Sequence, residues 1–218
     1  MNNIEKQVLE LIGENIDNPD IFTDDSFGMA QIRDSINDGI EEIALVTGAY
    51  RDRYFLPLRA GRAFYRFDYK EGSIAWVSNA FLMVNQWRLE HTDLMKLRTF
   101  NPRFLYDSGV PRSYYPIGQD FIGLWPTPGS DGDILEIHAV IIPRRYSLDT
   151  DEVFVKQDYE YAAVQYAVGE YWASRGDVQS AIEHHNRYMQ MIGLELPTEN
   201  DYRFQMKSSK EPWPRKTG

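Results

Sequence analysis

Residues 108–143 have the sequence SGVPRSYYPIGQDFIGLWPTPGSDGDILEIHAVIIP, which decides the fold class of this chain. The segment predicts three short strands, because the apolar run 121–125 and the alternating run 134–142 are bounded by turn-forming residues. Gly109-Val110-Pro111 and Pro126-Thr127-Pro128-Gly129 supply those turns. The sequence on both sides has helical periodicity, so the chain is predicted to be an α+β protein with an inserted antiparallel β-domain.

Two helices are predicted within residues 1–50. The first carries one apolar stripe and should end before Asn18-Pro19, its stripe being Ile4, Val8, Leu11 and Ile12. The second begins at a cap on Asp25 or Ser26 and ends near Thr47-Gly48. Its apolar residues recur at spacings of three and four, at Met29, Ile32, Ile36, Ile40 and Ile43. These long N-terminal helices are expected to form part of a helical bundle.

The period changes to two after residue 51, which predicts strands at 54–58, 64–67 and 74–77. Pro57 cannot donate a ladder hydrogen bond, so its strand should lie at an edge or end there. Residues 80–89 are predicted to form a further strand, and residues 91–100 a short helix capped by Thr92.

A helical hairpin and a tail follow the β-domain. Residues 158–174 and 178–192 have helical periodicity, with Arg175-Gly176-Asp177 as turn and cap. Residues 194–218 have no period. A disordered terminus is one interpretation of this tail; the other is an extended arm that binds a partner, with Tyr202, Arg203, Phe204, Met206 and Trp213 as its anchors. The predicted divisions are 1–50, 51–150, 151–193 and 194–218.

The net charge of −10 is unevenly distributed along the chain. Residues 1–50 carry a net charge of −9 and residues 51–120 a net charge of +4. Such an acidic chain is not expected to wrap DNA tightly, because that affinity comes from cations that displace counterions. Either the acidic residues are solvated helix faces, or they meet a basic partner or line a channel through which nucleic acid slides. The basic middle could complement the acidic region between subunits, through Arg51, Arg53, Arg59 and Arg62.

Signatures of chemistry are absent from the sequence. There is no cysteine, which excludes disulfides and thiolate metal sites, and no phosphate-binding, zinc-protease or serine-hydrolase motif. His184 and His185 are adjacent on a helix and point about 100° apart, so they are not expected to chelate one metal. Asp131-Gly132-Asp133 is interpreted as a turn, and four tryptophans are predicted to be core: Trp76, Trp87, Trp125 and Trp172. No apolar run approaches the roughly 18 residues of a membrane-spanning helix, so an intracellular protein without cofactors or metals is expected.

In their order and spacing, several motifs resemble the head-to-tail adaptor (connector) proteins of tailed double-stranded DNA bacteriophages. The motifs are INDGIEEIA at 36–44, YFLPL at 54–58, GVPRSYY at 109–115, IGLWPTP at 122–128, the strand ending at Pro143, and the hairpin from Tyr159. The resemblance covers residues 26–190. It implies a structural, non-enzymatic protein of the virion neck that forms a ring of about twelve copies beneath the portal protein. Such a ring extends the channel for passing DNA and gives tail or nozzle proteins a platform, and a C-terminal arm commonly reaches the portal.

Two alternatives remain open at this point. One is another neck protein, such as a stopper or tail-completion ring, which needs an element that crosses and closes the channel. The other is a small hydrolase, which would be favoured by a buried His138 or His185 against a carboxylate in a pocket.

Overall fold

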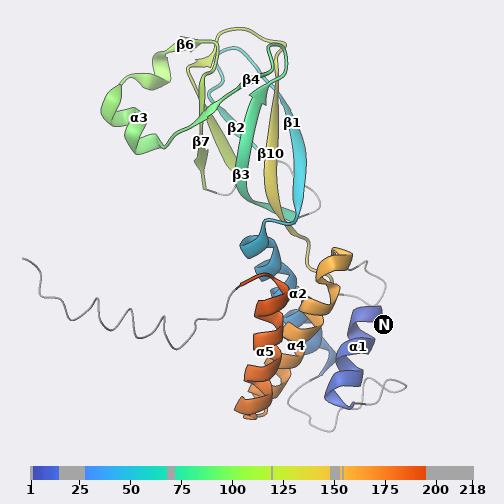
Figure 1. Ribbon diagram of the computed structural model, residues 1–218. Coiled ribbons are helices and arrows are strands. Elements are labelled where there is room, and N and C mark those ends of the chain that lie inside the picture. Colours follow the sequence, from blue (N-terminus) through green and yellow to red (C-terminus); the bar gives the residue numbers. More distant parts are fainter. Residues whose placement is uncertain are drawn as a thin grey trace, which may run out of the picture.

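A computed structural model describes residues 2–14, 28–67, 72–118, 120–147, 153 and 155–194. The longer helices gather at one end of the molecule, and the strands and the short helix α3 (Leu94–Phe100) lie at the other (Figure 1). We call residues 51–143 the β-head, and the described residues before and after them the helical base. The mixed α and β character predicted from the sequence is confirmed. The predicted arm at 194–218 falls outside the described residues except for Leu194.

The helical base contains α1 (Asn3–Ile12), α2 (Met29–Thr47), α4 (Glu160–Ser174) and α5 (Val178–Met191), with a short 3-10 turn, η2 (Gln157–Tyr159), before α4. Helix α4 is central, because α1, α2 and α5 all pack against it. Its buried alanines at 162, 163 and 167 permit this close approach. Residues from both ends of the chain therefore share one hydrophobic core.

Local sequence explains where these helices end. Gly13 and Gly48 adopt the left-handed conformation that stops α1 and α2, with φ of 77° and 57°. The side chain of Asp177 caps α5 by accepting from the Ser180 N–H at 3.1 Å, as predicted. The isoleucine stripe of α2 is buried, again as predicted.

The described residues of the β-head form two four-stranded sheets and a two-stranded ladder. The first sheet has the order β1-β10-β3-β4, from β1 (Arg51–Pro57), β10 (Ile134–Pro143), β3 (Gly72–Leu82) and β4 (Trp87–Arg88). The second has the order β2-β8-β7-β5, from β2 (Phe64–Arg66), β8 (Phe121–Trp125), β7 (Ser113–Ile117) and β5 (Glu90–His91). The ladder joins β6 (Ser108–Gly109) to β9 (Thr127–Pro128). Strand β1 is an edge strand that ends at Pro57, as predicted.

Pairing in the β-head is mostly antiparallel, but β5 pairs with β7 and β6 with β9 in parallel. Between β5 and β6 the chain forms helix α3 (Leu94–Phe100) and the 3-10 helix η1 (Phe104–Tyr106), which project sideways from the head (Figure 1).

Several sequence predictions were wrong in detail. Residues 80–89 do not form one strand, since β3 ends at Leu82 and a turn through Gln86, with φ of 49°, reverses the chain into β4. The cap of α3 is Asp93, whose carboxylate accepts from the Lys96 N–H at 2.7 Å, and not Thr92. In α1 the buried stripe includes Glu5 and Leu9, while Leu11 is exposed. The proposed caps of α2, Asp25 and Ser26, lie outside the described residues.

Candidate protein-interaction surfaces

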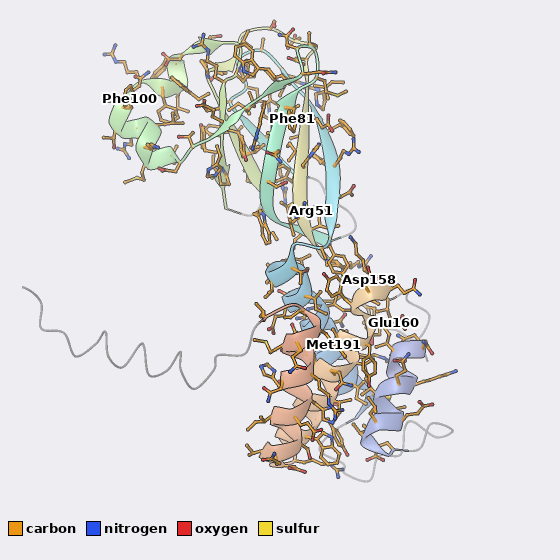
Figure 2. The ribbon with its side chains drawn as sticks, viewed as in Figure 1. Arg51, Phe81, Phe100, Asp158, Glu160 and Met191 are labelled. Carbon is orange, nitrogen blue, oxygen red and sulfur yellow. The ribbon has the colours of Figure 1, made fainter. Side chains whose placement is uncertain are left out.

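The four arginines predicted to form an intersubunit patch lie along one side of the β-head, and all four are exposed. Arg51 and Arg53 belong to edge strand β1, with Arg51 at the boundary between head and base (Figure 2). Arg59 and Arg62 lie beyond the other end of that strand. The arginines therefore follow the edge of the sheet instead of forming one compact cluster.

Local contacts orient three of these side chains. The Arg51 Nε donates to the Gly48 carbonyl at 3.0 Å, and the Arg53 guanidinium lies 3.6 Å from the Glu136 carboxylate. The Arg62 Nε donates to the Phe64 carbonyl at 2.9 Å, and its guanidinium lies 5.2 Å from the Tyr65 ring centroid. The Arg51 hydrogen bond is part-buried and the Arg62 hydrogen bond is exposed, and the Arg53 and Arg62 side chains reach solvent, where their charges remain available to a partner.

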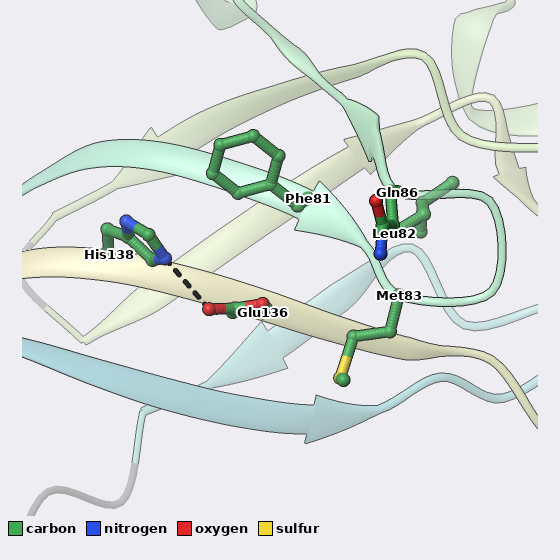
Figure 3. Close-up of a pocket in the computed structure, with 6 residues that line it drawn as sticks. All are labelled: Phe81, Leu82, Met83, Gln86, Glu136 and His138. Atoms are coloured by element: carbon green, nitrogen blue, oxygen red, sulfur yellow. Dashed lines mark hydrogen bonds and ion pairs between the residues drawn. The ribbon is translucent and has the colours of Figure 1, made fainter.

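A hollow on the outer face of the first sheet is lined by Phe81, Leu82, Met83, Gln86, Glu136 and His138 (Figure 3). Its polar centre is the His138 Nε2, 2.8 Å from the Glu136 Oε1, and Arg53 approaches the same carboxylate from the neighbouring strand. The Phe81 ring packs 5.2 Å from the imidazole. This is a histidine–carboxylate pair in a pocket, but His138 is not buried as the hydrolase alternative required.

The chemistry of that hollow is incomplete for hydrolysis. The His138 side chain is 37% exposed, and the lining contains no hydroxyl or thiol that could act as a nucleophile. The other histidine in question, His185, is exposed and packs its ring 5.9 Å from the Tyr188 ring. Its neighbour His184 hydrogen-bonds the Gln165 side chain at 2.8 Å, and burial lowers the pKa of His184. In the described part of the chain, no group of three or more metal-ligating side chains occurs.

The α3–η1 projection carries the most exposed apolar side chains of the β-head. Phe100 is 93% exposed and Tyr106 87%, and Phe100 extends from the projection away from the sheets (Figure 2). Met95 and Val110 are also more than half exposed. Contiguous exposure of large apolar residues marks an interaction surface. The sequence predicted the helix but gave no sign that its apolar residues face water.

Two tryptophans predicted to be core are exposed instead. Trp76 lies on β3 and Trp87 on β4, and both are at least two-fifths exposed. Trp76 pairs with Val140 of β10, and Trp87 pairs with the core residue Leu82 of β3, so their exposure could not be inferred from the pairing alone. Trp125 and Trp172 are partly buried and pack against the hydrophobic clusters.

A shallow groove runs between α4 and α5 on the helical base. It is lined by Tyr166, Gly169, Glu170, Ala173, Ala181, Ile182, His185 and Asn186. Three carboxylates, those of Glu42, Glu170 and Asp38, lie close enough to Tyr166 to influence its ionisation. Burial makes the largest contribution, and repulsion from these carboxylates adds to it, so the pKa of the Tyr166 phenol is raised to about 12. The groove is therefore apolar with an acidic rim.

The anchors predicted for the C-terminal arm, Tyr202, Arg203, Phe204, Met206 and Trp213, lie outside the described residues. A family model described as SU10 adaptor protein matches residues 4–209 of the chain. The chain belongs to the SU10 adaptor family. No curated protein matches it.

Family membership confirms the resemblance inferred from the motifs, and makes the adaptor a structural protein of a bacteriophage virion. An adaptor works through contacts with other virion proteins, which agrees with surfaces rich in exposed arginine and aromatic residues. Within the described ranges, no helix of the adaptor is both long enough and apolar enough to cross a lipid bilayer.

The family motifs have structural reasons in the adaptor. Gly39 lies beneath Tyr166 where α2 crosses α4, and a Cβ there would come within 3.0 Å of the ring. Asn37 is buried, and its amide donates to the Tyr146 carbonyl at 2.8 Å and accepts from the Tyr146 N–H at 3.1 Å. This pair of hydrogen bonds ties α2 to the segment that leaves the β-head.

Proposed function

We propose that the adaptor forms a ring of about twelve copies beneath the portal protein, extends the DNA channel and gives tail proteins their platform. The observation that carries this proposal is the family match over residues 4–209. On this proposal the site of action is the virion neck, and the function is assembly and conduction of DNA without catalysis. The predicted divisions near residues 50, 150 and 193 then separate a helical base, a β-head and an arm.

The charge of the two units supports a role around passing DNA. The described residues of the helical base contain twelve acids and seven bases, a net charge of −5, and those of the β-head have a net charge of +2. A channel lined by carboxylates repels the phosphate backbone, so DNA passes without binding. We propose that the helical base supplies this lining.

The sides of the β-head support lateral association. Edge strands β1 and β2, which the arginine-bearing segment joins, lie on one side, whereas edge strands β4 and β5 lead into the α3–η1 projection on the other. Ring closure requires two different complementary surfaces on each subunit. We propose that the Arg51, Arg53, Arg59 and Arg62 side of one copy contacts the opposite side of the next copy.

The arm residues Tyr202, Arg203, Phe204, Met206 and Trp213 are proposed to bind the portal protein or a neighbouring subunit in the assembled neck. Tyrosine, tryptophan and arginine provide much of the binding energy at protein interfaces.

Mass measurement of the full chain with and without its cognate portal protein tests the proposal. Without the portal we expect monomers or loosely associated chains of 25.4 kDa. With the portal, about twelve copies should add roughly 300 kDa to the portal assembly, and images should show a ring with an open centre. A chain that stays monomeric beside an intact portal contradicts the proposal, and a ring whose centre is closed by this chain favours a stopper.

A further inference from the structure

The α4–α5 groove defined above is an unpartnered apolar surface. Ile182 on its rim is half exposed, and Val178, one turn earlier on the same face of α5, is 64% exposed. Gly169, Ala173 and Ala181 have small side chains, which leave the space between the helices shallow and open. A bulky aromatic or aliphatic side chain that filled this space would remove apolar surface from water.

The rim of the groove selects a basic occupant. Glu170 lines it, and no ion pair neutralises Glu170 or the nearby Glu42 among the residues that the structure describes. Asp38, the third carboxylate, already binds Arg145. Arg187 lies further along α5 and pairs with Glu183, so the edge beside Tyr166 keeps its negative charge.

A segment of the chain outside the described residues has the matching chemistry. Residues 202–213 contain three basic residues and one acidic residue, a net charge of +2. Tyr202, Phe204 and Trp213 lie among these charges. The segment thus combines the positive charge and the aromatic side chains that an acidic, apolar groove favours.

The linker between α5 and this segment is long enough for the segment to bind the groove of its own molecule. The described chain ends at Leu194, shortly after α5. The Leu194 N–H donates to the Met189 carbonyl at 3.0 Å, which holds this residue at the end of the helix. Ile182 lies twelve residues back along the chain, about 18 Å along the helix axis. Residues 195–201 span up to about 23 Å when extended. A linker this short holds the segment at an effective concentration of order millimolar, so it competes strongly with a second copy.

We propose that residues 202–213 bind in the α4–α5 groove of the same chain before assembly. The release of this segment to a portal protein or neighbouring subunit rests on the proposed function, whereas the docking in the free chain does not. In the free chain the segment covers the exposed groove, which keeps the aromatic side chains out of water and the chain monomeric.

Photo-cross-linking of the full chain tests the docking. Trp213 is replaced by p-benzoylphenylalanine, the protein is irradiated as an equal mixture of unlabelled and ¹⁵N-labelled chains, and cross-linked peptides are assigned by mass spectrometry. We expect most cross-links to reach residues 166–186 and to join atoms of one chain. Cross-links that join labelled to unlabelled chains, that fall on the β-head, or that scatter evenly over the surface overturn the proposal.

Matched variants test the groove itself. In Ile182→Asp and in Glu170→Lys the cross-link yield at 50 mM salt should fall at least five-fold, while Leu45→Asp on α2 and Glu10→Lys on α1 should leave it unchanged. Glu170 is exposed, so its variant keeps the test valid where Ile182→Asp does not fold. Equal losses in the control variants overturn the proposal. Ring formation on the portal is measured separately, so a failed docking and a failed assembly are distinguishable.

Discussion

At the scale of single residues, a buried ion pair shows what a one-dimensional pattern misses. Solvated helix faces were one interpretation of the acidic residues in 1–50, yet Glu5 of α1 is fully buried. Its carboxylate binds the Arg33 Nε at 2.8 Å and accepts from the Asn2 N–H at 3.0 Å, which completes a capping box on α1. The partner lies on another helix, so no local periodicity could reveal that this carboxylate is buried.

Two phenols of the α4–α5 hairpin, the buried Tyr188 and the partly buried Tyr166, should make the adaptor sensitive to alkaline pH. Burial and nearby carboxylates raise the pKa of Tyr166 to about 12, and burial, then Glu42, raises the pKa of Tyr188 further. Tyrosine in the unfolded chain titrates near pH 10, so the folded state retains protons that the unfolded state loses. The contribution of these tyrosines to the free energy of unfolding is therefore fully present below pH 10, and it should decrease as the pH rises from about 10 toward 12.

Urea unfolding at pH 8, 10 and 11 measures this fall. In Tyr166→Phe the free energy of unfolding should decrease less between pH 10 and pH 11 than in wild type, because the variant has no phenol to titrate at that position. Tyr106→Phe, which alters an exposed residue on η1, is the matched control and should leave the fall unchanged. The same pH dependence in wild type and Tyr166→Phe would contradict the assignment.

At the scale of elements, Gly123 controls the packing of β8 on β7. It lies opposite Tyr115, and a Cβ at this position would come within 2.3 Å of the Tyr115 ring, which is fully buried. Gly123→Ala should therefore lower the free energy of unfolding by about 1–3 kcal/mol, the usual cost of overpacking. Gly109→Ala in β6 meets no atom within 4 Å and should change it by less than about 0.5 kcal/mol. Chemical denaturation of the two variants measures the contrast, and equal losses would refute the packing argument.

Element length decided how much of the fold the sequence could predict. Helices α2, α4 and α5 and strand β10 were found, because each repeats its period over ten or more residues and most have a capping or turn residue at an end. Strands β4, β5, β6 and β9 have two residues each; β4 pairs with β3 across a tight turn, whereas β5, β6 and β9 exist only because strands about twenty residues away pair with them. The alternation within 80–89 continued through the tight turn at Gln86, so one strand was predicted where two antiparallel strands occur.

The candidate surfaces were predicted unevenly for a related reason. Positive charge in the middle of the chain is visible in the sequence, and the structure places Arg51, Arg53, Arg59 and Arg62 at exposed positions in strand β1 and in the loop after it. Exposure of Phe100 and Trp87 was not predictable, because apolar residues in a short amphipathic segment are equally consistent with a core position. Their exposure becomes evident only when the folded chain leaves nothing to cover them.

At the scale of the whole molecule, the opposite charges of base and head lie one above the other along the long axis (Figure 1). In a ring of parallel subunits, acids would therefore form one band and bases another, and each copy would meet its neighbour at the same level. Lateral attraction must then arise within a band. For the β-head, exposed Glu90 and Asp93 lie on the side opposite the arginine edge, and they are the complementary charges that this geometry offers.

This arrangement predicts how assembly depends on salt. Replacing Arg51, Arg53, Arg59 and Arg62 together with glutamine should raise the concentration needed for ring assembly on the portal at least ten-fold at 50 mM salt. The difference should nearly vanish at 0.5 M salt, where exposed charges are screened within about 4–5 Å. Replacing Arg144, Lys156, Arg175 and Arg187 removes the same charge from exposed positions of the helical base and should have a smaller effect. Native mass spectrometry across the salt series measures ring formation. If the glutamine variant assembles like wild type at both salt concentrations, the four arginines do not contribute to ring assembly. The family assignment does not depend on this result.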